Sequence, residues 1–301
     1  MRTVFTQKLE ELAKNDSDIM VLTADLGWFF GSFRKNLPNQ FINCGVAEEN
    51  MVGIAAGLAL AGKKVYCYSI SPFLTIRALE SIKINVCLHD LNVVLMGAGG
   101  GLVYGMDGVT HQATEDIAVM RSLPNMTVVA PGDLLEIEAL AEESVNYQGP
   151  LYIRFGRNNA PQVHANKPEL RIGKGIILNK GEKIALIACG SLLFEAKKAV
   201  DKLKEKGLNI TLVSMPTIKP IDKELLRILS ESHKIIFTLE DHSVIGGLGS
   251  AVSDVLEDVK INKISLPDKY LDFIGSVDYL YKKCGLDVES IAQKIYESSI
   301  R

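Results

Sequence analysis

The chain has 301 residues, of which 47% are hydrophobic and 23% charged, and this composition predicts a globular protein with room for two domains. The formal net charge of −3 and a sequence pI near 6.0 argue against nucleic-acid binding, which needs clustered Lys and Arg. The five cysteines are widely spaced and the longest apolar stretch is only residues 53–62, so we expect no disulfide framework, no membrane span and a cytoplasmic location.

The first half of the chain alternates apolar runs of strand and helix character. Strands are expected at 18–23, 64–70, 92–96, 126–129 and 151–154, and helices at 3–14, 47–62, 73–88 and 133–146. The run Val93-Val94-Leu95-Met96 is apolar throughout, which is typical of a strand buried on both faces. The alternation predicts a parallel sheet with helices on both sides.

The second half repeats this pattern on a smaller scale. Residues 160–174 have the Pro-containing, mixed-charge composition of a linker. Strands then follow at 183–189, 209–215, 234–239 and 260–265, with helices at 193–206, 221–231, 247–258 and 286–298. The predicted fold class is therefore α/β, with a parallel-sheet domain at 1–165 and a smaller α/β domain at 175–301.

One short stretch, Gly-Val-Ala-Glu-Glu-Asn-Met at 45–51, places two carboxylates at a helix start. The helix macrodipole alone explains negative charge at that position. A second interpretation is functional, because Gly53 and Gly57 keep the first turns slim enough for a flat ligand or another chain to approach. The local sequence leaves both interpretations open.

Two glycine-containing motifs have simpler interpretations than they first suggest. Gly97 to Gly101 follows a strand, but Leu102 stands where a dinucleotide fingerprint needs its third glycine, so nicotinamide binding is not favoured. Gly132-Asp133 and Asn158-Asn159 nearly match the spacing of a Mg²⁺ motif. Leu134 replaces the second glycine, however, and we interpret Asp133 as a helix cap.

A polar loop follows the glycine-rich segment and places several functional groups together. Asp107-Gly108-Val109-Thr110-His111-Gln112 carries a carboxylate, a hydroxyl, an imidazole and an amide after a strand of the expected sheet. Ligands gather at such strand ends in α/β folds, although a structural histidine in a polar loop is also possible. Arg154 and Arg157, at the last strand of the first domain, are expected near the same rim, and Arg157 is the better candidate to bind a phosphate.

Taken together, these motifs resemble the transketolase superfamily, which includes 1-deoxyxylulose-5-phosphate synthase. The shared segments, in order, are Ala24-Asp25-Leu26, the 45–51 stretch, Phe73-Leu74, 107–112, 129–133 and 157–159. The chain is similar to the C-terminal half of these enzymes alone. The resemblance implies a thiamine diphosphate pyrimidine-binding domain at 1–165 and a transketolase C-terminal domain at 175–301.

The resemblance also implies roles for particular residues. Glu48 matches the catalytic acid that hydrogen-bonds N1′ of thiamine diphosphate, and Glu49 has a supporting role. Phe73 matches a residue that packs on the aminopyrimidine, and Asp25 one near the cofactor. Asp107 and His111 match residues that touch substrate hydroxyls, His111 being a second catalytic residue, and Arg157 matches a phosphate ligand. Where transketolases carry a His, this chain has Gly99. We therefore expect either that acceptor recognition differs from that of the relatives or that Tyr104, Trp28 or Arg34 takes over this role.

The resemblance implies an enzyme that needs a second chain. We expect a split transketolase in which an N-terminal subunit supplies the diphosphate and Mg²⁺ ligands, this chain supplies no metal ligand, and the two form an α2β2 heterotetramer. The reaction would transfer a two-carbon ketol unit from a ketose or ketose phosphate to an aldose. The alternatives are the β subunit of a 2-oxoacid dehydrogenase E1 component and a noncatalytic nucleotide-binding Rossmann-like protein.

Overall fold

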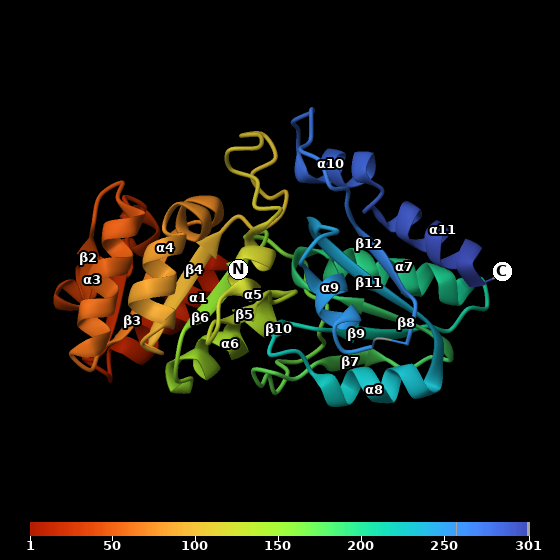
Figure 1. The fold of residues 1–301 in the computed structure, drawn as a ribbon, viewed down its shortest axis with the longest axis horizontal. Coiled ribbons are helices and arrows are strands. Elements are labelled where there is room, and N and C mark those ends of the chain that lie inside the picture. Colours follow the sequence, from red (N-terminus) through yellow and green to blue (C-terminus); the bar gives the residue numbers. More distant parts are fainter. Residues whose placement is uncertain (257, 300–301) are drawn as a thin grey trace.

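The computed structural model describes residues 1–256 and 258–299, which form two α/β units side by side (Figure 1). The sheet of the first unit has seven strands in the order β10-β5-β6-β4-β3-β1-β2, and that of the second has five in the order β12-β11-β8-β9-β7. Most neighbouring strands are parallel. The predicted α/β class is confirmed.

Helices cover both faces of the first sheet because its central strands are apolar on both sides. The strands are β1 (Ile19–Thr23), β2 (Phe41–Asn43), β3 (Lys64–Ile70), β4 (Val93–Ala98), β5 (Thr127–Val129) and β6 (Leu151–Phe155). Val93 and Leu95 of β4 pack into one core with α3 (Glu48–Leu60) and α5 (Asp116–Ser122). Val94 and Met96 pack into the other with α1 (Arg2–Ala13) and α6 (Leu134–Asn146).

Several short elements of the first unit differ from the sequence-based expectation. The segment expected as one helix at 73–88 consists of π-helical turns η3 (Phe73–Arg77) and η4 (Ile82–Cys87) around α4 (Leu79–Ser81). Helices η1 (Gly27–Phe30), α2 (Gly31–Asn36) and η2 (Pro38–Gln40), strand β2 and helix α5 were not expected. These pieces are short, so their apolar periodicity is weak.

The second unit is built from β7 (Ile176–Asn179), β8 (Lys183–Ala188), β9 (Thr211–Ser214), β11 (His233–Ser243) and β12 (Ile261–Leu266). Its helices are η5 (Gly190–Leu192), α7 (Leu193–Glu205), α8 (Lys223–Ser232), α9 (Leu248–Ser253), α10 (Val277–Cys284) and α11 (Val288–Ser299). Helix α9 is shorter than expected, and β7 and α10 were not expected. Strand β10 (Thr217–Lys219) leaves this unit and pairs antiparallel with β5 of the first sheet. The two units therefore share a sheet edge.

The segment 160–174 contains no helix or strand, as its composition predicts, yet it is firmly attached. The backbone N–H groups of Val163 and His164 each donate to Asp133 Oδ2 at 2.9 Å. Asp133 Oδ1 accepts from the backbone N–H groups of Leu135 and Glu136, the first turn of α6. The predicted cap at Asp133 is confirmed, and the same carboxylate also ties the segment between the units to α6.

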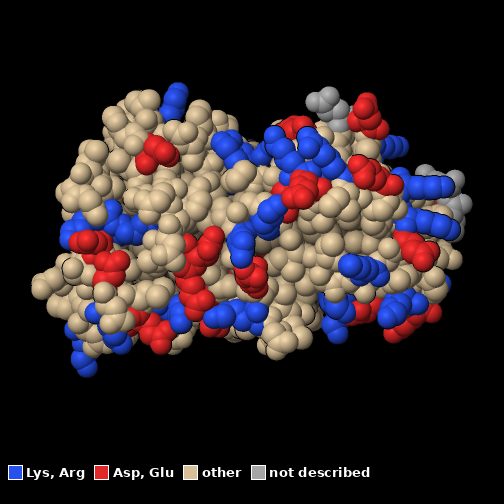
Figure 2. Space-filling model, turned by 90° about the horizontal axis from the view of Figure 1, so that it is seen from below, with Lys and Arg blue, Asp and Glu red and all other residues tan. Residues whose placement is uncertain are grey.

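The distribution of charge on the surface and the character of the helices fit what the composition predicts. On the face seen in Figure 2, Lys and Arg side chains alternate with Asp and Glu and do not form one continuous positive area. Among the helices of residues 1–256 and 258–299, none has the length and apolar character needed to cross a membrane.

Candidate active site

Glu48 begins α3 and lies beside the ends of the central strands of the first sheet. Its side chain is 2% exposed, although it is a carboxylate. The Ser69 hydroxyl, near the end of β3, donates to Oε1 at 2.9 Å, and Arg77 Nη1 donates to Oε2 at 2.7 Å. A buried carboxylate is costly unless it is paired and hydrogen-bonded, and these two donors meet that need. Glu49, the next residue, is exposed.

Arg77 connects Glu48 to a row of rings. Its guanidinium carbon lies 4.7 Å from the centre of the Phe73 ring, which is one turn earlier in η3. The Phe73 ring meets the His111 ring edge to face, with centroids 5.1 Å apart. Glu48, Phe73 and His111 are distant in the sequence, and the structure brings all three to one side of the first unit.

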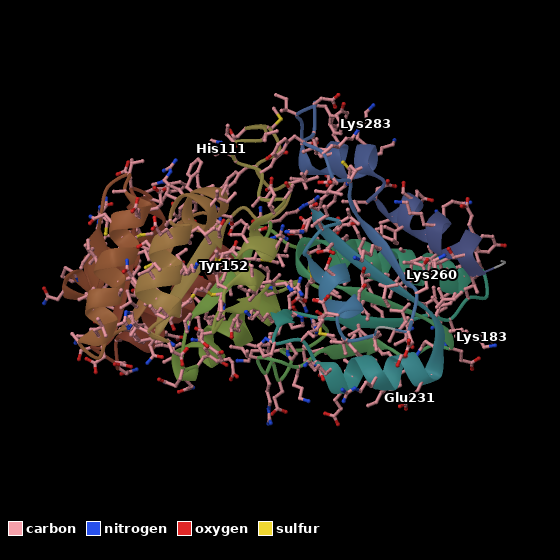
Figure 3. The ribbon with its side chains drawn as sticks, in the orientation of Figure 1. His111, Tyr152, Lys183, Glu231, Lys260 and Lys283 are labelled. Carbon is pink, nitrogen blue, oxygen red and sulfur yellow. The ribbon has the colours of Figure 1, made fainter. Side chains whose placement is uncertain are left out.

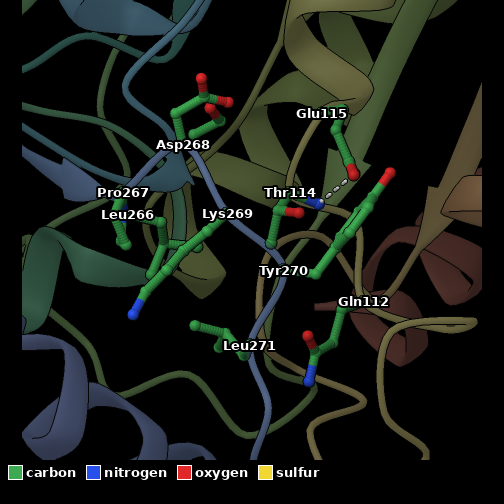
Figure 4. Close-up of a pocket in the computed structure, with 10 residues that line it drawn as sticks. Gln112, Thr114, Glu115, Leu266, Pro267, Asp268, Lys269, Tyr270 and Leu271 are labelled. Carbon is green, nitrogen blue, oxygen red and sulfur yellow. Dashed lines mark hydrogen bonds between the residues drawn. The ribbon is translucent and has the colours of Figure 1, made fainter.

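Three hollows follow one another along this side. The first, about 500 Å³, is lined by Glu48, Asn50, Gly53 and Arg77 among others. Arg77 also lines the second, about 290 Å³, together with Phe73, Thr110 and Gln112. Gln112 continues into the third, about 370 Å³, between the units (Figure 4). The shared residues make the hollows neighbours, so a ligand beside Glu48 would face the 107–112 loop.

The glycine-rich segment turns the chain sharply and presents that loop. Gly99 and Gly101 have φ values of +82° and +63°, and Cβ atoms at Gly99 and Gly101 would collide with the Tyr104 ring and Asp241 respectively. The loop rises from the first unit toward α10, with His111 near its tip (Figure 3). The Thr110 hydroxyl lies 2.9 Å from His111 Nδ1, and Asp107 is exposed. The glycines therefore serve loop geometry, as the incomplete dinucleotide fingerprint suggests.

Tyr104 occupies the space above Gly99 that a side chain at that position would need. Arg2 Nη1, at the start of α1, donates to the Tyr104 hydroxyl at 2.8 Å. The Arg2 guanidinium carbon also lies 4.5 Å from the Phe29 ring centre, and Phe29 stacks on Trp28 with centroids 3.6 Å apart. Trp28 is 69% exposed, so these rings extend the same surface outward from the site.

The other expected site residues lie at this edge of the sheet with different degrees of exposure. Asp25 follows β1 and is exposed. Its φ is +56°, and its backbone N–H donates to Asn43 Oδ1 at 3.1 Å. Arg157 follows β6 and is half-buried, with its guanidinium directed to the second unit. Burial would lower the pKa of Arg157, but Tyr281, Glu195 and Asp278 raise it. Arg34 is exposed on α2.

Arg154 was expected near the same rim, and it does lie beside Ala113, but it is buried and not accessible to a ligand. Its side chain is buried, with Nε donating to Asp116 Oδ2 at 2.9 Å and Nη1 to Asp241 Oδ1 at 2.7 Å. Tyr281 donates its hydroxyl to Asp241 Oδ2 at 2.9 Å. Arg154 belongs to the interior because β6 is covered on both sides, and its ion pairs join the two units.

The sequence did not single out Arg77, Ser69 and Arg2, although it carries a signal for one of them. Arg77 is four residues after Phe73, a spacing that places a cation over a ring in a helix. Ser69 and Arg2 carry no local signal, because their partners are distant in the chain. Within the described residues, no group of three His, Cys, Asp or Glu side chains could hold a metal ion.

Known proteins match nearly the whole length of this chain. The family model "Transketolase, pyrimidine binding domain" matches residues 1–162, and "Transketolase, C-terminal domain" matches 173–291. A putative transketolase C-terminal section from Methanocaldococcus jannaschii is 42% identical over 99% of this chain and 95% of that protein. An apulose-4-phosphate transketolase subunit from Phocaeicola vulgatus is 38% identical, covering 98% and 96% respectively. A solved split-gene transketolase, an inactive β4 tetramer, is 33% identical with a TM-score of 0.88, covering 98% and 96%.

Proposed function

The chain belongs to the transketolase family, and from this premise we propose that it is the C-terminal subunit of a split, thiamine-diphosphate-dependent transketolase. The reaction is transfer of a two-carbon ketol unit from a ketose to an aldose. The relative named for apulose-4-phosphate supports a phosphorylated sugar as substrate. The match over nearly the whole length of split transketolase subunits disfavours the 2-oxoacid dehydrogenase and nucleotide-binding alternatives.

The single observation that supports this proposal most strongly is the buried acid beside a hollow. Glu48 is 2% exposed, lines a hollow of about 500 Å³, and is followed along the surface by the Phe73 ring. A carboxyl group that can reach a ring nitrogen and an aromatic side chain that can pack on a ring fit an aminopyrimidine. When bound, thiamine diphosphate supplies the nucleophilic carbon for ketol transfer.

Each site residue then has a proposed task. Glu48 exchanges a proton with the pyrimidine nitrogen, and Ser69 and Arg77 hold its carboxylate in place. Phe73 packs on the pyrimidine, and Asp25 lies near the cofactor at the subunit contact. His111, whose Nδ1 is next to the Thr110 hydroxyl, holds or moves a proton at a substrate hydroxyl.

Two further side chains are assigned to the substrate end of the site. Asp107, exposed on the same loop, binds a substrate hydroxyl, and Arg157 binds the phosphate through its guanidinium. We keep 1–165 and 175–301 as the proposed domains, and a cytoplasmic location as the proposed setting.

The proposed assembly completes the cofactor site. An N-terminal subunit would carry the Mg²⁺ and diphosphate ligands, while this chain contributes the pyrimidine side of the site. An α2β2 heterotetramer follows if each cofactor lies between two unlike subunits. The inactive state of the β4 tetramer among the solved relatives supports the need for that partner.

The test is Glu48→Gln measured in the complex with the partner subunit. The amide keeps the shape of the side chain but cannot carry the proton, so turnover should fall on the order of a hundredfold or more. Glu49→Gln, the exposed neighbour in the same helix turn, is the matched control and should keep most of the activity. Near-normal turnover in Glu48→Gln with intact assembly would remove the central assignment.

A further inference from the structure

Arg157 belongs to the first unit, but the second unit holds it. Its backbone N–H donates to the Ser191 hydroxyl oxygen at 3.2 Å. Its guanidinium carbon lies 4.8 Å from the centre of the Tyr281 ring, on α10. The Tyr281 hydroxyl is tied to Asp241, which also pairs with the buried Arg154, so the ring beneath the guanidinium is fixed. Arg157 is thus positioned from the C-terminal unit.

The outer edge of the guanidinium faces one acid. Asp278 Oδ1 lies 2.9 Å from Arg157 Nη2, and Asp278 is 83% exposed on the first turn of α10. Nε and Nη2 of Arg157 are buried, and apart from the contact of Nη2 with Asp278 they have no polar partner among the described residues. Two donors on one edge of a guanidinium are what a bidentate oxyanion uses.

We propose that Asp278 is a specificity-determining residue: its carboxylate occupies the oxyanion-binding edge of Arg157 and is displaced by the phosphate of the substrate. This rests on the proposed role of Arg157. An exposed carboxylate held by one imperfect ion pair costs little to displace, since such pairs contribute little in water. Asp278 therefore weakens phosphate binding and reduces the preference for phosphorylated over unphosphorylated substrates, because only the phosphate has to displace it.

The segment that leads into α10 also contacts the substrate loop. The Gly275 N–H donates to Gly105 O at 3.3 Å, so the segment before α10 contacts the loop that carries Asp107 and His111. Figure 1 shows α10 beside that loop, at the top of the molecule. The C-terminal unit thereby contributes to substrate choice at a position far along the chain from the cofactor-binding residues.

The experiment measures how tightly inorganic phosphate binds to the complex of this chain with its partner subunit. Binding is determined from the rise in the unfolding temperature in phosphate, relative to chloride at the same ionic strength. Asp278→Asn should tighten phosphate binding by about two- to fivefold, the range expected for loss of one exposed ion pair. KM for a ketose phosphate should fall by the same factor, and KM for the unphosphorylated ketose should stay unchanged. Asp254→Asn is the matched control, because Asp254 forms a comparable exposed pair with Arg121.

Arg157→Ala separates failure of this inference from failure of the phosphate assignment. If Arg157→Ala does not weaken phosphate binding, the assignment of Arg157 itself is wrong. If Arg157→Ala weakens it but Asp278→Asn leaves it unchanged or weaker, the displacement model is overturned. In the double variant the effect of Asp278→Asn should disappear, and an effect that persists would also overturn the model.

Discussion

Asp133→Asn tests whether one carboxylate both begins α6 and holds the segment between the two units. Asparagine is as good a helix cap as aspartate, so a simple cap predicts almost no loss of stability. In this structure both oxygens are used. Oδ1 accepts from Leu135 and Glu136, and Oδ2 accepts from the backbone N–H groups of Val163 and His164. An amide can replace only one of these oxygens as an acceptor.

The cost follows from the two backbone donors that lose their acceptor, and the His164 ring, whose Nδ1 lies 3.1 Å from Oδ2, loses the same partner. With the amide oxygen turned to the helix, the amide NH₂ faces the N–H groups of Val163 and His164, and each unsatisfied donor costs about 1–3 kcal/mol. Because Asp133 is fully buried, water cannot replace the lost acceptor. We expect a total loss of roughly 2–4 kcal/mol, or roughly 3–6 °C in the unfolding midpoint for a chain of this size.

The assay is thermal or urea unfolding of the chain at fixed concentration. Asp287→Asn is the matched control, because Asp287 Oδ1 accepts from Glu289 and Ser290 while Oδ2 meets only the Ser290 hydroxyl, which can also act as an acceptor. It should cost well under about 1 kcal/mol. If Asp133→Asn costs no more than Asp287→Asn, the second function of Asp133 is refuted.

The same carboxylate predicts an acid-sensitive contribution to stability. Burial would raise the pKa of Asp133, but hydrogen bonds from His164, Glu136 and Val163 lower it to about 2 from the ordinary 3.8. The stabilisation, about 2 kcal/mol by linkage, is fully present above the ordinary pKa and is lost as the pH falls through about 2. The unfolding midpoint of Asp133→Asn should therefore approach that of the unsubstituted chain at low pH.

Two further substitutions test other contacts of the site. Arg77→Met keeps the length of the side chain but removes the donor to Glu48. Turnover of the assembled enzyme should fall about fivefold, which is the effect expected from losing a half-exposed, charge-assisted hydrogen bond. Unchanged kinetics would show that Ser69 alone positions the acid. Arg154→Met leaves two buried carboxylates unpaired and should lower the free energy of unfolding by roughly 3–5 kcal/mol, measured by urea unfolding. A loss below about 1 kcal/mol would mean that the buried network does not join the units.

Patterns within a few residues predicted much of the structure. The apolar run at 93–96 predicted a strand buried on both faces, and the two faces of β4 do pack into two separate cores. Pro131-Gly132-Asp133 before an apolar helix predicted a cap, which the hydrogen bonds confirm. The family resemblance, carried by ordered motifs, is likewise confirmed. The roles of Glu48, Phe73, Asp107 and His111 stay predictions.

The strands and helices with clear periodicity, the cap and the family were therefore predictable from the residues alone, because each depends on neighbours along one element or on motif order. Three contacts became visible only in the folded chain: Arg77 pairs with Glu48, Arg154 is buried between the units, and Asp278 meets Arg157. Arg77 and Glu48 are 29 residues apart, and Arg154 and Asp241 are 87 apart, so their meeting depends on how strands and helices pack. Strand β10 joined the first sheet for the same reason.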